Sequence, residues 1–342
     1  MSTTDFARLL TRYLSQHLPA QRNLSSRTIE SYRDTFKLLL RFGHQERGWV
    51  FECITLSHID RACIEAFLDW LETTRHSSVA TRNQRLAALR AFFRWVSYES
   101  PESIEMTQRV LGIPWKRTAQ PIITYLTPEA MKTLLVQPDR QTGRGRRDTT
   151  LLALLYDTGA RVQEIADVRV RDIRLGEPAV ITLTGKGGKR RVVPLMTGTT
   201  VLATEYMAQY QLTRPEFQDH PLFFNHQHHP LSRWGITYIL NKYVDLARVQ
   251  YPGGFPDTVS PHVMRHSKAM HLLQAGVNLI YIRDFLGHSD VTTTEIYARA
   301  DAEMKRKALE SATIPAMDIS PISWTDDSDL MVWLTQLTKR TI

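Results

Sequence analysis

The sequence is poor in cysteine. Cys53 and Cys63 are the two cysteines among 342 residues, and they do not form a CxxC pair. Disulfide-stapled secreted domains and cysteine-rich zinc sites both need more cysteines or closer pairs. The composition therefore argues against a disulfide framework and against a cysteine-rich zinc site, and it fits a reducing compartment.

Long apolar runs are also missing. No stretch approaches the roughly 20 apolar residues that span a bilayer. The first residues, Met-Ser-Thr-Thr-Asp-Phe-Ala-Arg, lack the basic patch and apolar run of a secretory signal. We therefore expect a soluble, cytoplasmic protein with no membrane partner.

Positive charge is abundant. Lysine and arginine number 43 against 35 acidic residues, which gives a formal net charge of +8. An excess of this sign favours a polyanionic partner, most often nucleic acid, although many basic proteins bind none. The length of 342 residues allows two ordinary domains.

Hydrophobic periodicity predicts a fold that is mainly α with a small β-sheet. Residues 1–112 repeat apolar positions at helical spacing and predict a four-helix domain, followed by a proline-containing linker at 113–123. Residues 124–312 mix helices with two strands, Val180–Thr184 and Arg191–Leu195, joined by a glycine-rich hairpin turn. The tail, 313–342, includes a possible short amphipathic helix around Leu330–Leu337.

Basic residues cluster near the end of the first domain. On a helix these residues form a solvated surface or lie against DNA phosphates, and the absence of acidic residues among the arginines makes the two interpretations comparable. The candidate DNA-binding residues are Arg75, Arg82, Arg85, Arg90, Arg94, Lys116 and Arg117.

Several segments of the second domain carry reactive side chains. Each is ordinary in isolation, because Arg161 could pair with Glu164 on a surface and Tyr297 could be a half-buried aromatic. The segments are Thr158-Gly-Ala-Arg161-Val-Gln-Glu164-Ile, the hairpin with Lys186, Pro261-His262-Val-Met-Arg265-His266, Leu286-Gly-His288 and Thr294-Glu-Ile-Tyr297.

Together these side chains have the chemistry that phosphoryl transfer needs. Forked guanidinium groups stabilise charge on the non-bridging oxygens, and a leaving oxygen needs a proton donor. A tyrosine phenol needs nearby cations and a proton acceptor to become a nucleophile. No aspartate–glutamate cluster of the two-metal kind is evident, so we expect no metal.

The order of these residues resembles the tyrosine recombinase/integrase family, whose phage-integrase-like members include transposon-encoded recombinases. The resemblance covers about residues 6–312. It implies an N-terminal helical core-binding (SAM-like) domain and a C-terminal catalytic domain that close as a C-shaped clamp on double-stranded DNA. The residues that carry it are Arg161, Lys186, His262, Arg265, His288 and Tyr297.

The resemblance also implies a role for each residue. Tyr297 attacks and forms a 3′-phosphotyrosyl link, Arg161 and Arg265 hold the phosphate, and Lys186 protonates the leaving 5′ oxygen. The two histidines, His262 and His288, bind the phosphate or relay the tyrosine proton, and Glu164 braces the site. Neither ATP nor another cofactor is implied, and four subunits act on two DNA sites, alone or with sister recombinases.

Two features depart from the commonest family pattern. Many relatives carry an aromatic residue where this chain has Lys268, in the segment Ser267-Lys268-Ala269-Met270. This local sequence is closer to transposon-encoded recombinases than to chromosome resolvases. The tail is longer than in minimal relatives and is expected either to dock on a neighbouring subunit or to be a flexible or self-packed end.

Other interpretations compete with a recombinase. The triplet His226-x-His228-His229 suggests a metal site, but it lacks a ligand of another type at suitable spacing and is better explained as a polar loop. A DNA-binding architectural subunit would not need the tyrosine and its helpers. A type IB topoisomerase-like relaxing enzyme would use the same chemistry without assembly.

Overall fold

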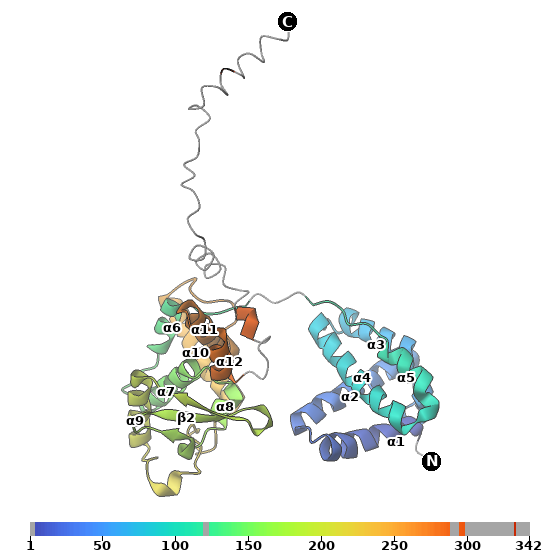
Figure 1. The fold of residues 1–342 in the computed structure, drawn as a ribbon, viewed down its shortest axis with the longest axis horizontal. Coiled ribbons are helices and arrows are strands. Elements are labelled where there is room, and N and C mark those ends of the chain that lie inside the picture. The colour runs from blue at the N-terminus through green and yellow to red at the C-terminus, as the bar shows by residue number, and fades with distance from the viewer. Residues whose placement is uncertain (1–3, 119–122, 288–293, 298–331, 333–342) are drawn as a thin grey trace. The chain divides into compact units, whose positions relative to one another are not determined.

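The computed structural model describes residues 4–118, 123–287, 294–297 and 332 of the chain. It divides the protein into two compact units, Met1–Pro121 and Ile122–Ile342 (Figure 1). Helices predominate and one small sheet lies in the second unit, which confirms the predicted fold class. No described helix is long and apolar enough to cross a bilayer.

Unit 1 is helical throughout. Thr4, Ser25, Asp60 and Ser78 each cap a helix by accepting a hydrogen bond from a backbone amide three residues ahead, as short polar side chains do at this position. The helices are α1 (Asp5–Arg12), a π-helical stretch (Tyr13–Gln21), α2 (Ser26–Arg47), α3 (Arg61–Thr73), α4 (Val79–Glu99) and α5 (Ile104–Leu111), with 3-10 turns at Phe51–Cys53, Leu56–His58 and Pro101–Ser103.

An aromatic core holds unit 1 together. Phe36 of α2 and Phe92 of α4 meet edge to face with ring centroids 5.0 Å apart, a favourable geometry for aromatic pairs. The periodicity did not predict α5. The first residues of the predicted linker pack on this unit, because Ile113 is buried in its core and Trp115 lies under Arg90.

Unit 2 combines helices with a three-stranded antiparallel sheet of order β1-β2-β3. Thr127 caps the helix that Pro128 begins. Its elements are α6 (Pro128–Leu135), α7 (Gly143–Asp157), α8 (Val162–Ala166), β1 (Ile173–Arg174), β2 (Val180–Thr184), β3 (Arg190–Pro194), α9 (Thr197–Gln209), α10 (Arg233–Gln250), α11 (Pro261–Gln274) and α12 (Leu279–Leu286), with 3-10 turns at Val170–Asp172, Lys186–Gly188 and Pro215–Phe217.

The predicted hairpin is confirmed. β2 and β3 pair from Val180 opposite Pro194 to Thr184 opposite Arg190, so β3 begins one residue earlier than predicted. The two-residue strand β1 is too short to give an alternating pattern and was not predicted. The hairpin turn itself contains Lys186.

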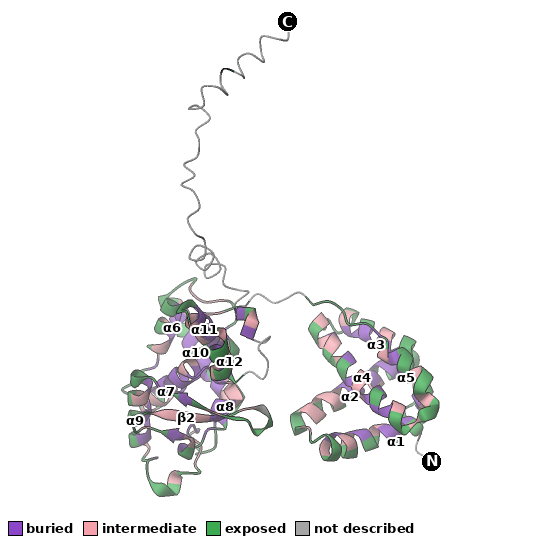
Figure 2. Cartoon of the chain, in the orientation of Figure 1, coloured by how far each residue is buried: buried purple, intermediate pink, exposed green. Residues whose placement is uncertain are grey.

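Helix α7 is the central helix of unit 2. Its residues Leu151–Leu155 are buried, and it packs against both α9 and α11 (Figure 2). Helix α8 contacts α10 and β2, and α11 contacts α12. This packing draws the separate motifs of the sequence onto adjoining elements. The helix predicted at Leu330–Leu337 lies outside the described residues, Val332 excepted.

Candidate active site

Arg161 and Glu164 form a compact pair at the start of α8. Glu164 Oε2 accepts a hydrogen bond from the Arg161 backbone N–H at 2.9 Å, and Oε1 accepts one from Arg161 Nη1 at 2.8 Å. Glu164 is 4% exposed, whereas the Arg161 side chain is 36% exposed. The carboxylate therefore fixes a guanidinium group that still faces solvent.

Arg191 of β3 approaches the same carboxylate from the other side. Its Nη1 and Nη2 donate to the two oxygens of Glu164 at 3.1 and 2.8 Å, and its Nε donates to Phe285 O at 3.0 Å. Burial raises the pKa of Glu164, but hydrogen bonds from Arg191 and Arg161 outweigh it and leave the pKa below its usual value. Glu164 is thus a buried carboxylate that braces two arginines.

Arg265 lies on α11 and is 2% exposed. Its Nη1 donates to Gly159 O at 2.5 Å and its Nη2 to Leu286 O at 2.7 Å. Gly159 has a φ of +55°, which glycine adopts without strain, and this turns its carbonyl toward the guanidinium group. Burial and the nearby Arg161 and Arg191 lower the pKa of Arg265 to about 10, so it stays cationic at neutral pH.

The end of α12 anchors Arg191 and Arg265. Phe285 O and Leu286 O are carbonyls of its last turn, and they accept from Arg191 and Arg265. Exposed carbonyls make a helix C-terminus partly negative, so two cations are favourable there. Gly287 ends the helix with a φ of +65°.

Two histidines share a face of α11. His262 is exposed, and its ring stacks on that of His266 with centroids 6.1 Å apart. Partial desolvation, with the charges of Arg265 and Arg161, lowers the pKa of His262. Burial, with His262 and Arg265 nearby, lowers the pKa of His266 to about 4. Both imidazoles are therefore neutral at pH 7.

Tyr297 packs against α11 and α12. Its ring lies with Ala269, Met270, Ile282 and Leu286 and is 1% exposed. Its Oη lies 2.9 Å from His266 Nδ1. Burial raises the pKa of Tyr297, while the positive charges of Arg265 and Arg161 oppose that rise. The phenol is therefore protonated and lies within electrostatic range of both guanidinium groups.

Two predicted site residues can be placed only through their neighbours. Lys186 lies in the turn after β2, and the structure describes its backbone but not its side chain. A Cβ on the preceding Gly185 would lie 3.1 Å from Glu164 Oε1, so the backbone of this turn borders the cluster. His288 lies outside the described residues, directly after Gly287.

Comparisons with known proteins agree with this chemistry. Residues 124–304 match the model of the Phage integrase family, and residues 10–99 match the Phage integrase, N-terminal SAM-like domain. The chain belongs to the phage integrase family. It is a tyrosine recombinase, an enzyme that cleaves and rejoins DNA.

Curated relatives resemble this recombinase along most of its length. It is 37% identical over 334 residues to a protein of Sinorhizobium fredii named as an integrase/recombinase (y4rC), covering 97% of the chain and 98% of the relative. It is 33% identical to the tyrosine recombinase XerC of Roseiflexus castenholzii, covering 84% and 88%. These names favour neither an architectural subunit nor a topoisomerase-like enzyme.

Solved structures show the same fold. The XerH recombinase in a post-cleavage complex with its difH substrate aligns with a TM-score of 0.68 at 23% identity, covering 86% of this chain and 81% of that one. The Tn1549 transposon integrase in complex with transposon right end DNA aligns with a TM-score of 0.67 at 17% identity, covering 89% and 99%.

Two residues of this recombinase's cluster were missed from the sequence. Arg191 lies two residues before buried Val193 on β3. Side chains two apart on a strand share a face, so strand periodicity could have placed Arg191 on the inward side. His266 directly follows Arg265, and its position one turn after His262 places the two on one face of α11. The hydrogen bond to Tyr297 has no signal in the sequence.

Three of the predicted DNA-binding arginines are not on the exposed surface that DNA binding requires. Arg82 is 5% exposed and bonds to Asn83 Oδ1 and Pro114 O. Arg85 donates to Ser31 O and to Thr35 Oγ1, each at 3.1 Å, and Arg90 stacks on Trp115 and donates to Ile113 O. These groups join α4 to α2 and to the segment after α5.

The other four predicted DNA-binding residues are exposed. Arg75 lies over the ring of Trp70 at 5.8 Å, and Lys116 pairs with Glu72. Arg94 and Arg117 form no ion pair with the described part of the chain. Of the predicted DNA-binding residues, these four therefore have exposed charged groups, and that of Lys116 is shared with Glu72.

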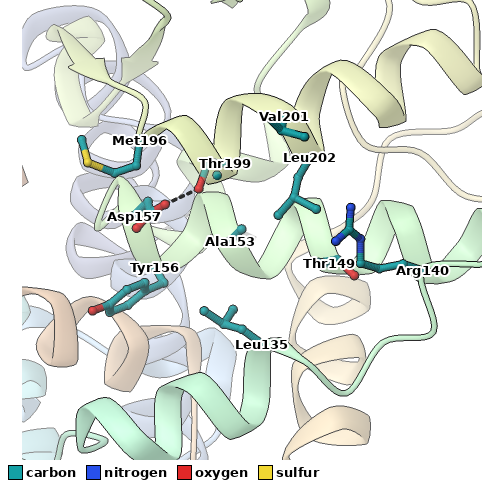
Figure 3. Close-up of a pocket in the computed structure, with 11 residues that line it drawn as sticks. Leu135, Arg140, Thr149, Ala153, Tyr156, Asp157, Met196, Thr199, Val201 and Leu202 are labelled. Atoms are coloured by element: carbon teal, nitrogen blue, oxygen red, sulfur yellow. Dashed lines mark hydrogen bonds between the residues drawn. The ribbon is translucent and has the colours of Figure 1, made fainter.

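The apolar pocket of unit 2 shown in Figure 3 lies apart from the cluster. It is lined by residues of α7 and α9 such as Ala153 and Leu202, and Thr199 donates to Asp157 at its edge. Asp157 also pairs with Lys268 at 3.4 Å, so the lysine that departs from the family pattern points toward α7. None of the reactive residues lines this pocket.

The histidine-rich loop gives no support to a metal site. His228 adopts a φ of +60° and stacks on Phe224 with centroids 5.0 Å apart. Within residues 4–118, 123–287 and 294–297, no three histidine, cysteine or acidic side chains group in a way that could hold a metal ion.

Proposed function

We propose that this recombinase cuts a DNA strand by attack of Tyr297 Oη on a backbone phosphorus, which forms a 3′-phosphotyrosyl bond and frees a 5′ hydroxyl. Rejoining reverses the step with a different 5′ hydroxyl. The phosphotyrosyl bond conserves the energy of the broken phosphodiester, so strand exchange needs neither ATP nor a metal.

Tyr297 meets Arg265 at the end of α12, and this convergence carries the proposal: the Tyr297 ring shares an apolar cluster with Leu286, whose carbonyl accepts a hydrogen bond from Arg265, and the charges of Arg265 and Arg161 oppose the rise in the pKa of the phenol. Arg265 is fixed by two backbone carbonyls and Arg161 by Glu164, so neither must reorganise when negative charge develops on the phosphate. Because the tyrosine is buried, the phosphate can reach its oxygen only if the surrounding protein opens on DNA binding.

Proton transfer involves further side chains. Lys186 is assigned the proton for the leaving 5′ oxygen, and the backbone of its turn at the Arg161–Glu164 pair supports this role. His262 and His288 are assigned to the phosphate oxygens or to relay of the tyrosine proton. The low pKa of His262 supports a neutral imidazole for that purpose.

DNA binding and assembly extend the proposal. The two units would close as a C-shaped clamp on double-stranded DNA, with Arg75, Arg94, Lys116 and Arg117 on its phosphates. Four copies would act on two DNA sites, alone or with sister recombinases, in the cytoplasm and in the service of a mobile element. The tail, 313–342, would dock on a neighbouring subunit.

A suicide substrate tests the nucleophile. On a nicked cognate site the cut piece diffuses away, so wild-type protein should accumulate as a covalent DNA adduct on a denaturing gel. Tyr297→Phe should bind the site but form no adduct. Tyr281→Phe, which alters an exposed tyrosine of α12, should behave as wild type. An adduct formed by Tyr297→Phe would refute the assignment.

A modified leaving group tests the acid. Lys186→Ala should slow cleavage far more than binding, whereas Lys189→Ala in the same turn should not. A substrate with sulfur in place of the leaving 5′ oxygen departs without a proton and should restore the rate of Lys186→Ala. Failure of this rescue would rule out Lys186 as the acid.

A further inference from the structure

The hydrogen bond between His266 and Tyr297 has a chemical consequence. His266 Nδ1 lies 2.9 Å from Tyr297 Oη, with ring centroids 5.6 Å apart and an interplanar angle of 59°. The two residues are 31 positions apart in the sequence and meet because α11 packs against the short helical segment at 294–297. This separation is within hydrogen-bond reach, the geometric requirement for a general base.

We propose that His266 accepts, through Nδ1, the proton that Tyr297 loses when it attacks phosphorus. In the Nε2–H tautomer, Nδ1 carries a lone pair and the phenol donates to it. As the Oη–P bond forms and the P–O5′ bond breaks, the phenol proton moves to Nδ1, and the leaving oxygen takes a proton from its own acid. In rejoining, the imidazolium returns the proton to the departing phenolate.

Other groups near the phenol are less suited to this role. Glu164 accepts four hydrogen bonds, from the Arg161 backbone and from the guanidinium groups of Arg161 and Arg191, so its oxygens are occupied. His262 is exposed and its ring stacks on that of His266, so of its two proposed roles the one on the phosphate oxygens is left to it. Among the described residues, His266 is therefore the side chain in contact with the proton that must move.

The charges around His266 make this base depend on the substrate. An imidazolium there would lie beside Arg265 and His262, and its pKa of about 4 without DNA reflects burial and these neighbours. A phosphodiester bound by Arg265 and Arg161 adds a negative charge that stabilises the imidazolium. The phenol would thus stay protonated until a phosphate is seated.

Single-turnover cleavage of the suicide substrate tests this role, which rests on Tyr297 being the nucleophile. His266→Asn places an amide near Nδ1, which can keep a hydrogen bond but cannot hold the proton. Cleavage should fall by about 10²–10⁴-fold, the usual effect of losing a general base, with little change in DNA affinity. The sulfur leaving group should not restore it, since the missing function is not the acid.

The pH profile separates a base from a positioning group. Wild-type cleavage should rise with pH and level off once His266 is neutral in the DNA complex. His266→Asn should lack this plateau and keep rising, because hydroxide must then take the proton. A purely structural histidine would leave the shape of the profile unchanged and lower only its height.

His271→Asn is the matched control. His271 lies on the same helix and also contacts a tyrosine, with Nδ1 2.9 Å from Tyr156 Oη, but not Tyr297. It should keep the wild-type cleavage rate and profile in folded protein. A His266→Asn rate within threefold of wild type, or an unchanged profile, would overturn the base role alone. An adduct formed by Tyr297→Phe would overturn the nucleophile as well.

Discussion

Replacement of Glu164 by glutamine should destabilise unit 2 by about 3 kcal/mol. Removing one partner of a buried ion pair costs about 3–5 kcal/mol, because the remaining charge is left uncompensated. Glu164 is 4% exposed and faces Arg191, whose side chain is 13% exposed, so the pair is well shielded from water. Glutamine keeps one acceptor oxygen, which places the cost near the lower limit.

Thermal unfolding followed by circular dichroism measures this cost. For a domain of this size, 1 kcal/mol corresponds to about 2–4 °C in Tm, so the unfolding of unit 2 should shift down by roughly 6–12 °C. Gln163→Ala, on the same helix but only partly buried, is a suitable control and should shift it much less. A shift below about 2 °C for Glu164→Gln would refute the reasoning.

The pH dependence gives an independent check. The pKa of Glu164 is lower in the fold than in an unfolded chain, where it is about 4.3. Its carboxylate therefore contributes stability that is complete above about pH 4.3 and is lost as pH falls through the folded pKa. The difference in unfolding free energy between wild type and Glu164→Gln should shrink below pH 4, and a constant difference would contradict the ionised pair.

A double substitution separates stability from catalysis. Glu164→Leu with Arg191→Met replaces the buried pair by apolar side chains, a change that is often nearly neutral. We expect most of the lost stability to return. Cleavage should stay low, because Arg161 loses the carboxylate that fixes its guanidinium group. Recovery of both properties would show that Glu164 only supports folding.

Other predictions concern packing, DNA binding and the tail. Gly145→Ala should cost about 1–3 kcal/mol in unfolding experiments, since a Cβ would lie 1.8 Å from Asp139 O, whereas Gly198→Ala, with nothing within 4 Å, should gain up to about 1 kcal/mol. Arg94→Ala should reduce the slope of log K against log salt concentration in DNA binding by about one, the effect of losing one phosphate contact. Arg82→Met, at a buried position, should leave this slope unchanged. Deletion of residues after Ile314 should weaken synapsis more than DNA binding, and normal recombination by the truncated protein would exclude tail docking.

Local patterns predicted the parts of the fold that depend on neighbours in sequence. The pairing of β2 with β3 follows from strand alternation on the two sides of a glycine-rich turn. The partner of Arg82 could not be predicted in this way. Its spacing of four and seven residues from Leu86 and Leu89 places it on the buried face of α4, but the Pro114 carbonyl that accepts its hydrogen bond comes from the segment after α5.

The sequence by itself determined which reactive residue types are present, their order along the chain, and the helices and hairpin that carry them, because these depend on side-chain chemistry and local periodicity. Tertiary structure alone decided their partners. Glu164 against Arg191, Arg265 at the end of α12, and His266 against Tyr297 are contacts between elements far apart in sequence. Such contacts arise from the packing of the helices and strands around α7, which no short stretch of sequence records.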